Sequence, residues 1–207
     1  MSTAVATETR RYTPEELLAM PDGKNFELVD GRLVERYIGA ESSRVGTQLC
    51  SRLDRFCEDQ NLGIVWAADN GYQCIPHQPS GVRRPDVSFV KRGRLPRDVP
   101  PRGWIRIPPD LAVEVVSPGD TAEDLEEKLR DYRKVGVPLV WVIYPELRVA
   151  KVFRRDGPSG ELEEEDVLSG EDVIPGFHCP LREILPRRAP AEEPGTTAAG
   201  PNGPGLA

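Results

Sequence analysis

Two strongly apolar segments enclose an amphipathic helix between residues 110 and 144, and this order restricts the fold more than any other feature of the chain. The segment "DLAVEVV" has the pattern of a strand, and "TAEDLEEKLRDYRKVG" has the pattern of a helix that ends at Gly136. "PLVWVIY" is apolar throughout, as are strands buried within a sheet. A strand, a helix and a strand in this order form a βαβ-like unit in which the helix covers one sheet face, so we predict an α/β fold.

The first third of the chain predicts two helices and a hairpin. Thr13, Pro14 and Glu16 have the spacing of a helix N-cap with a capping box, and the helix should run to about residue 20. "FELVDGRLVERY" alternates around Asp30-Gly31, a strong hairpin signal. Apolar residues then recur at helical spacing from residue 41 until Gly63 ends the helix.

Further strands and two tails complete the expected organisation. "IVWAADNGYQCI", "RRPDVSFV" and "RVAKVFRR" are predicted strands, and residues 91–109 are predicted to form a loop rich in Pro, Gly and Arg. The composition after Arg187 is dominated by Pro, Gly, Ala and Thr. We therefore expect one domain over residues 12–186, a disordered N-terminus over residues 1–11 and a disordered tail over residues 187–207.

Composition argues against several classes of protein. No stretch approaches the roughly 20 apolar residues of a membrane span, and the N-terminus lacks the apolar core of a signal peptide, so a cytoplasmic protein is expected. The four cysteines include no C-x-x-C pair, which argues against a zinc site. The net charge of −7 argues against broad electrostatic attraction to nucleic acid.

Two carboxylates interrupt apolar strands and point to chemistry. Asp86 follows Pro85 at a strand start, and Glu114 is the only charge on the strand face that it shares with Ala112 and Val116. A carboxylate in an apolar setting is costly unless it is paired, hydrogen-bonded or bound to a metal. If Asp86 and Glu114 converge, they raise each other's pKa unless a cation lies between them, and Mg²⁺ would satisfy them with oxygen ligands alone.

Five segments in order resemble a known family. "FELVDG", "RRPDVSFV", "DLAVEVVSPGD", "EDLEEKLRDYRKVGVPLVWVIYP" and "GEDVIPGFHCPL" are similar to the Uma-type restriction endonucleases, a bacterial branch of the PD-(D/E)XK nuclease superfamily. The resemblance covers about residues 12 to 186. It implies a restriction-endonuclease-like core, a mixed β-sheet flanked by helices, with an N-terminal β-hairpin. It also implies metal-dependent hydrolysis of phosphodiester bonds in nucleic acid, with DNA as the favoured substrate.

The resemblance assigns roles to individual residues. Asp86 and Glu114 match the two acids that bind Mg²⁺, or Mn²⁺ in its place, and Glu27 matches a third acid that completes or orients the metal site. The superfamily's usual lysine would stand at position 116, where this chain has Val116.

Lys128 on the following helix is the expected substitute for that lysine. It borders the buried stripe of its helix, so its stem can lie along the sheet while the ammonium reaches the sheet edge. The alternative is that Lys128 only pairs with Asp124 one turn earlier, on the surface.

A basic loop supplies candidate contacts to the nucleic-acid backbone. The bases Lys91, Arg92, Arg94 and Arg97 face a single acid, Asp98, in the loop that follows the Asp86 strand. An ordinary solvated loop explains the same composition. A homodimer is also compatible with the sequence, because an exposed apolar hairpin would suit an interface between copies.

Two rival functions remain open. The first is a nuclease-fold protein without catalysis that serves as a nucleic-acid-binding or interaction module. The acidic net charge and Val116 favour it, as do Ser42 and Ser43, which stand where many relatives place a histidine. The second is a structural module whose acids serve folding alone, in which case removal of Glu114 would raise stability or leave it unchanged.

Overall fold

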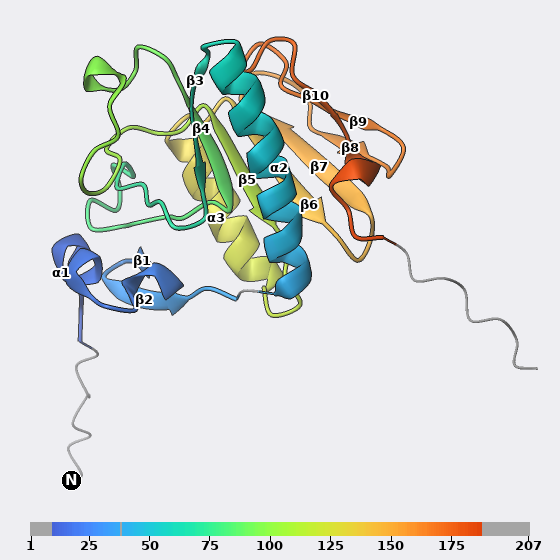
Figure 1. Cartoon of the computed structure of the whole chain (residues 1–207). Helices are drawn as coiled ribbons and strands as arrows, with labels where there is room; N and C mark the ends of the chain where they lie inside the picture. Colours follow the sequence, from blue (N-terminus) through green and yellow to red (C-terminus); the bar gives the residue numbers. More distant parts are fainter. Residues whose placement is uncertain (1–9, 38, 188–207) are drawn as a thin grey trace, which may run out of the picture.

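A six-stranded mixed sheet forms the centre of the computed structural model, which describes residues 10–37 and 39–187 (Figure 1). The strands lie side by side in the order β3-β4-β5-β6-β7-β8. Strands β5 and β6 are parallel, and all other neighbours are antiparallel. The predicted mixed sheet is therefore confirmed. Its strands are β3 (Gly63–Ala67), β4 (Val87–Lys91), β5 (Leu111–Val115), β6 (Leu139–Tyr144), β7 (Val149–Arg154) and β8 (Gly160–Leu162).

Two long helices cover opposite faces of this sheet. Helix α2 (Ala40–Asp59) crosses one face, and α3 (Ala122–Lys134) lies behind the other (Figure 1). The βαβ unit is confirmed, because α3 connects the parallel strands β5 and β6.

The alternation predicted along β5 decides which residues meet which helix. Leu111, Val113 and Val115 pack in the cluster that includes the α2 residues Val45, Leu49, Leu53 and Cys57. Ala112 packs on the other face with Leu129 and Tyr132 of α3. Each large apolar side chain buried in these clusters contributes about 1.5–3 kcal/mol relative to exposure.

The N-terminal hairpin forms a small separate sheet beside this core. It consists of β1 (Phe26–Val29) and β2 (Arg32–Glu35), joined by Asp30 and Gly31, which both have positive φ as a type I′ turn requires. Helix α1 (Pro14–Ala19) precedes it with the predicted Thr13–Glu16 capping box, and η1 (Gly23–Asn25) follows α1.

The apolar side of the hairpin is covered by the same chain, so it does not form the exposed surface that would suit an interface between copies. Leu28 is fully buried in a cluster with Leu17, Val82 and Trp104 of the same chain. The apolar side of the hairpin therefore serves the fold of this chain.

Two predicted strands are shorter than expected. The segment "IVWAADNGYQCI" is a strand only as far as Ala67, because a turn interrupts it and Tyr72 then forms single bridges with Arg83 and Ile105. A Cβ at Gly71 would lie 2.5 Å from the Trp104 ring, so this glycine permits the close approach of two loops. Strand β4 begins only at Val87, after Pro85, which has no N–H to donate.

The C-terminal part of the domain adds a short second ribbon. Strands β9 (Val167–Ser169) and β10 (His178–Pro180) pair antiparallel, and η3 (Leu181–Glu183) follows them. The loop after β4 contains η2 (Pro96–Asp98). Within residues 10–37 and 39–187, no helix has the length and apolar character needed to cross a membrane.

Most of both predicted tails lies outside the described residues, which exclude 1–9, 38 and 188–207. Arg11, at the end of the predicted N-terminal tail, donates a hydrogen bond to the carbonyl of Asp30 at 2.8 Å.

Replacing Gly31 with Ala tests the hairpin turn. An L-residue at this positive φ costs about 1–2 kcal/mol, and the new Cβ would lie 3.3 Å from that of Arg11. We expect urea denaturation to show a fall of this size in the free energy of unfolding. Asp30→Asn is the control, because Asn tolerates the same backbone region; an equal loss in both variants would contradict this account.

Candidate active site

The ammonium of Lys128 lies between two buried carboxylates. Lys128 Nζ is 3.0 Å from Glu114 Oε2 and 3.4 Å from Glu27 Oε1. The side chains of both acids are 5% exposed or less, while that of Lys128 is 19% exposed. Three of the four predicted catalytic residues therefore lie in direct contact. Lys128 pairs with these two buried acids and not with Asp124 on the surface.

Asp86 joins this group from the neighbouring strand. Val87 lies opposite Val113 in the antiparallel β4–β5 pair, so Asp86 stands beside the end of β5 that carries Glu114. Its Oδ2 accepts a hydrogen bond from the Val115 backbone N–H at 2.7 Å. Asp86, Glu114 and Glu27 are together called the acid group. The side chain of Asp86 is 28% exposed, which makes it the most solvent-exposed of the three.

Backbone pairing between the hairpin and the segment before Asp86 holds Glu27 in place. Leu28 and Val82 exchange two backbone hydrogen bonds of 3.0 and 2.8 Å, which fasten β1 to the segment before Asp86. Glu27 Oε1 then accepts from the Arg84 N–H at 2.7 Å, and Oε2 accepts from Arg83 Nη1 at 3.1 Å. Burial would raise the pKa of Glu27, but Lys128 and Arg83 outweigh burial and lower it, so Glu27 is a carboxylate.

Tyr132 is a site residue that was not among those predicted from the sequence. Its hydroxyl donates to Glu114 Oε1 at 2.5 Å, so both oxygens of Glu114 have a donor on α3. Lys128 and Tyr132 are four residues apart and share one helix face, which is the signal that could have linked them. Burial raises the pKa of Glu114, and Asp86 and Glu27 raise it further, while Lys128 acts in the opposite direction.

The three acids in turn stabilise the protonated form of Lys128. Burial alone would lower the pKa of this lysine, but the charges of Glu114, Glu27 and Asp86 keep it above the ordinary value. Lys128 is therefore an ammonium ion at neutral pH.

Arg83 connects the acid group to a second buried carboxylate. The guanidinium of Arg83, 3% exposed, lies 2.7 Å from Asp131 Oδ2 as well as 3.1 Å from Glu27. Asp131 also lies 3.2 Å from His77 Nε2, and Glu127 lies 3.4 Å from Arg83. No local signal in "RRPD" separates this buried arginine from an exposed one.

Arg36 contacts the acid group from the end of the hairpin. Its Nη2 lies 3.2 Å from Asp86 Oδ1, and its Nη1 donates to the carbonyl of Ala68 at 3.0 Å. Burial raises the pKa of Asp86, with Lys128, the Val115 N–H and Arg36 acting against that rise. The sequence interpretation did not identify Arg36, because the contact spans fifty residues.

The carboxylates of Asp86 and Glu114 suit a hard divalent cation. Among the described residues there is no group of three or more His, Cys, Asp or Glu side chains disposed around a common metal position. Mg²⁺ usually binds proteins through one or two carboxylates together with water and substrate phosphates, so two acids suffice. The carboxylate oxygens of Asp86 and Glu114 therefore fit Mg²⁺ or Mn²⁺ by chemical type, although both oxygens of each acid, like those of Glu27, accept from protein donors.

A small cavity lies against Glu114 and Lys128. It has a volume of about 20 Å³, and Asp120 and Asp124 also line it. About 10–15 Å³ of such space is needed to hold one water molecule. The cavity therefore has room for about one water beside the ammonium of Lys128.

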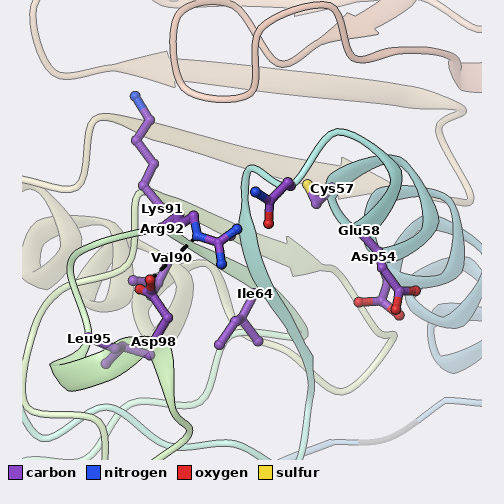
Figure 2. Close-up of a pocket in the computed structure, with 11 residues that line it drawn as sticks. Asp54, Cys57, Glu58, Ile64, Val90, Lys91, Arg92, Leu95 and Asp98 are labelled. Carbon is purple, nitrogen blue, oxygen red and sulfur yellow. Dashed lines mark ion pairs between the residues drawn. The ribbon is translucent and has the colours of Figure 1, made fainter.

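The predicted basic loop lies at the other end of β4. Lys91 ends the strand that Asp86 precedes, and five residues of strand span about 17 Å. Figure 2 shows Lys91 and Arg92 at a cavity of about 320 Å³ that Asp54 and Asp98 also line. Arg92 lies 3.6 Å from Asp98, and Arg94 lies 2.7 Å from Asp110. The structure thus does not bring Lys91, Arg92, Arg94 and Arg97 to the acid group.

Comparison with known proteins agrees with this fold. A crystal structure of a "putative nuclease belonging to DUF820" from Anabaena variabilis ATCC 29413 matches with a TM-score of 0.69 and 17% identity. The match covers 84% of this chain and 97% of that one, and it defines a nuclease-like fold. No curated protein matches the chain.

A family model assigns the chain. Residues 14–182 match the Uma2 model, described as "putative restriction endonuclease", and the chain belongs to this family. The Uma-type resemblance is confirmed. A nuclease-type function acting on nucleic acid follows at the level of the family.

Replacing Arg83 with Ala tests the buried network. Glu27 and Asp131 would lose their shared cation while remaining buried, and removing one partner of a buried pair costs about 3–5 kcal/mol. Urea denaturation should show a loss of that size. Arg182→Ala, which breaks the exposed pair with Glu165, should change little. A comparably small effect at Arg83 would show that the network does not support the fold.

Proposed function

We propose that the protein is a metal-dependent endonuclease that hydrolyses phosphodiester bonds, with DNA as the substrate. The observation that carries this proposal is the Lys128 ammonium held by Glu114 and Glu27, beside the partly exposed Asp86. Acids and a cation from the hairpin, two strands and a helix meet at one point of the sheet. Structural roles explain single members of this group, but they do not explain why all four converge.

Asp86 and Glu114 are the residues that would hold Mg²⁺ or Mn²⁺. When bound, the metal would supply Lewis-acid stabilisation of phosphate charge and a more acidic water. Glu27 has a different role from these two acids, because it is the most deeply buried of the three, at 1% exposure, and its oxygens contact Lys128, Arg83 and the Arg84 N–H. We assign to Glu27 the task of orienting Lys128.

Lys128 would act directly on the reacting groups. Its raised pKa keeps it a hydrogen-bond donor, so it can orient a water in the cavity of about 20 Å³ that it lines. The same positive charge would offset the negative charge that develops around phosphorus during in-line attack. Tyr132 fixes the opposite oxygen of Glu114, so Glu114 keeps its orientation toward the site.

The basic loop would contact the nucleic acid at some distance from the cleavage point. The roughly 17 Å between Lys91 and Asp86 corresponds to about five phosphates along one strand of a duplex. Lys91, Arg92, Arg94 and Arg97 would therefore position nucleic acid by backbone contacts and take no part in the chemistry.

Substitution of Asp86, Glu114 or Lys128 by Ala tests the assignment. Each variant should lower cleavage of plasmid or linear DNA in Mg²⁺ or Mn²⁺ by at least about a hundredfold, the effect of removing one electrostatic contributor to a transition state. Glu123→Ala and Arg130→Ala on α3 are exposed matched controls and should cut normally. Undiminished cleavage by Asp86→Ala would refute the proposed site.

Thermal unfolding with and without metal separates catalysis from a purely structural role of the acids. Ligand that binds only the folded state stabilises it, so Mg²⁺ or Mn²⁺ should raise the melting temperature of the wild type. Asp86→Ala and Glu114→Ala should lose this shift, whereas Glu123→Ala should keep it. If metal shifts the melting temperature of neither wild type nor Glu114→Ala, the acids bind no metal and their role is structural.

A binding protein without turnover is the second candidate. It is favoured by Val116 at the position of the superfamily's usual lysine, and by the protein donors that already satisfy Glu27, Glu114 and Asp86. Binding of DNA by wild type and by Asp86→Ala alike, with no cleavage of plasmid, duplex, single-stranded DNA or RNA, would establish this function instead.

A further inference from the structure

A second cavity adjoins the acid group and has no role in the mechanism above. Its volume is about 190 Å³, and it lies between the first half of α2, the end of β3 and the residues Arg36 and Tyr37. Asp86 belongs to its wall. The space is many times larger than the roughly 10–15 Å³ that one water needs, so it can admit a group of ring size directly beside a proposed metal ligand.

Gly46 keeps this cavity open. This residue lies within α2, where glycine destabilises a helix relative to alanine. A Cβ at position 46 would have no atom within 4 Å, so no packing contact requires a glycine there. Because Gly46 lines the cavity, any side chain at this position would project into the empty space and reduce it.

Tyr37 gives the cavity an exposed aromatic rim. Its exposed fraction is 55%, and it is the only one of the exposed large apolar side chains in the described residues that lines this cavity. A Cβ at Gly119 would lie 2.5 Å from Tyr37 Cδ1, so the ring rests directly on the backbone of that glycine. The ring is thus supported on one side and still open to solvent.

Polar groups also line the same space. The hydroxyls of Ser42 and Ser117 are 2.6 Å apart and buried, and both residues line the cavity. The Arg36 side chain, 8% exposed, is fixed by Asp86 and by the carbonyl of Ala68. An aromatic face combined with hydroxyl and guanidinium groups matches a nucleobase, which has a flat apolar face and a polar edge.

We propose that this cavity is a base-binding subsite, in which the nucleobase next to the scissile phosphodiester stacks on Tyr37. The proposal rests on the proposed nuclease function and adds a substrate class to it. A base inside a duplex is paired and stacked on both sides, and it must leave the helix to enter a pocket. The preferred substrate is therefore single-stranded or locally unpaired nucleic acid.

Binding measurements in EDTA test the subsite without metal-dependent cleavage. The probes are a short fluorescent oligo-dT and an abasic oligonucleotide of equal length, compared by anisotropy with wild type, Tyr37→Phe, Tyr37→Ala and Gly46→Leu. Tyr37→Ala should weaken oligo-dT binding by about fivefold to 150-fold, the range for loss of one base–aromatic stack. Gly46→Leu should weaken it similarly, and Tyr37→Phe should bind like wild type. None of these changes should alter binding of the abasic probe.

The outcomes distinguish failure of the subsite from failure of the nuclease function. Equal binding of the two probes by wild type, or unchanged oligo-dT binding by Tyr37→Ala, would overturn the subsite while leaving the nuclease function intact. Absence of binding to both probes and to duplex DNA would overturn both proposals. Gly46→Ala is a further control, because it favours the helix and fills little of the cavity; melting curves verify that each variant is folded.

Discussion

The ion pairs of Lys128 are the interaction on which the rest of the site depends. A buried ammonium is tolerated only when opposite charges replace its lost hydration, and Glu114 and Glu27 provide them from a strand and from the hairpin. Those acids need donors of their own, which Tyr132, Arg83 and the Arg84 N–H supply. The hairpin, the central sheet and α3 are therefore held in register by charge as well as by apolar packing.

Because Lys128 lies on a helix, strand β5 does not have to carry the lysine of the site. A lysine at position 116 would share the strand face of Glu114, whereas Val116 packs beside Ala112 and Leu129 in the apolar layer under α3. The ammonium arrives from α3 instead and still lies 3.0 Å from Glu114. The packing of Leu129 and Tyr132 on the sheet thus sets the position of the proposed catalytic cation.

Much of the fold and the outline of the site could be predicted from the sequence. The alternation along "LAVEV" placed Glu114 on the strand face of Ala112, and the structure shows that this face meets α3. The helical stripe predicted that Lys128 could reach the sheet edge, where the structure places it against Glu114. The Asp30-Gly31 turn fixed the hairpin that carries Glu27. These are local patterns, whose periods of two and of 3.6 residues have a direct geometric meaning.

The parts that could not be predicted depend on contacts between distant segments. Arg83 and Arg84 are adjacent in sequence, yet only the fold shows that one bridges Glu27 and Asp131 while the other lies over the Trp104 ring. The strand predicted over residues 64–75 ends at Ala67, because a turn and the tertiary contact at Gly71 outweigh the β-propensity of the residues that follow. The loop from Lys91 to Arg97 was correctly recognised as basic, but its position across β4 from Asp86 has no local signature.

Glu27 comes from a separate two-stranded sheet, so the site is assembled from residues of two sheets. Glu114 belongs to the central sheet and Asp86 directly precedes its strand β4, whereas Glu27 belongs to the hairpin. The Leu28–Val82 bridge and the ion pair between Glu27 and Arg83 join the hairpin to the segment before Asp86. The distance from Glu27 to Lys128 therefore depends on how the hairpin packs against the central sheet. The geometry of the site thus reports the contact between two sheets, which would not be the case if the lysine and its acids stood on one strand.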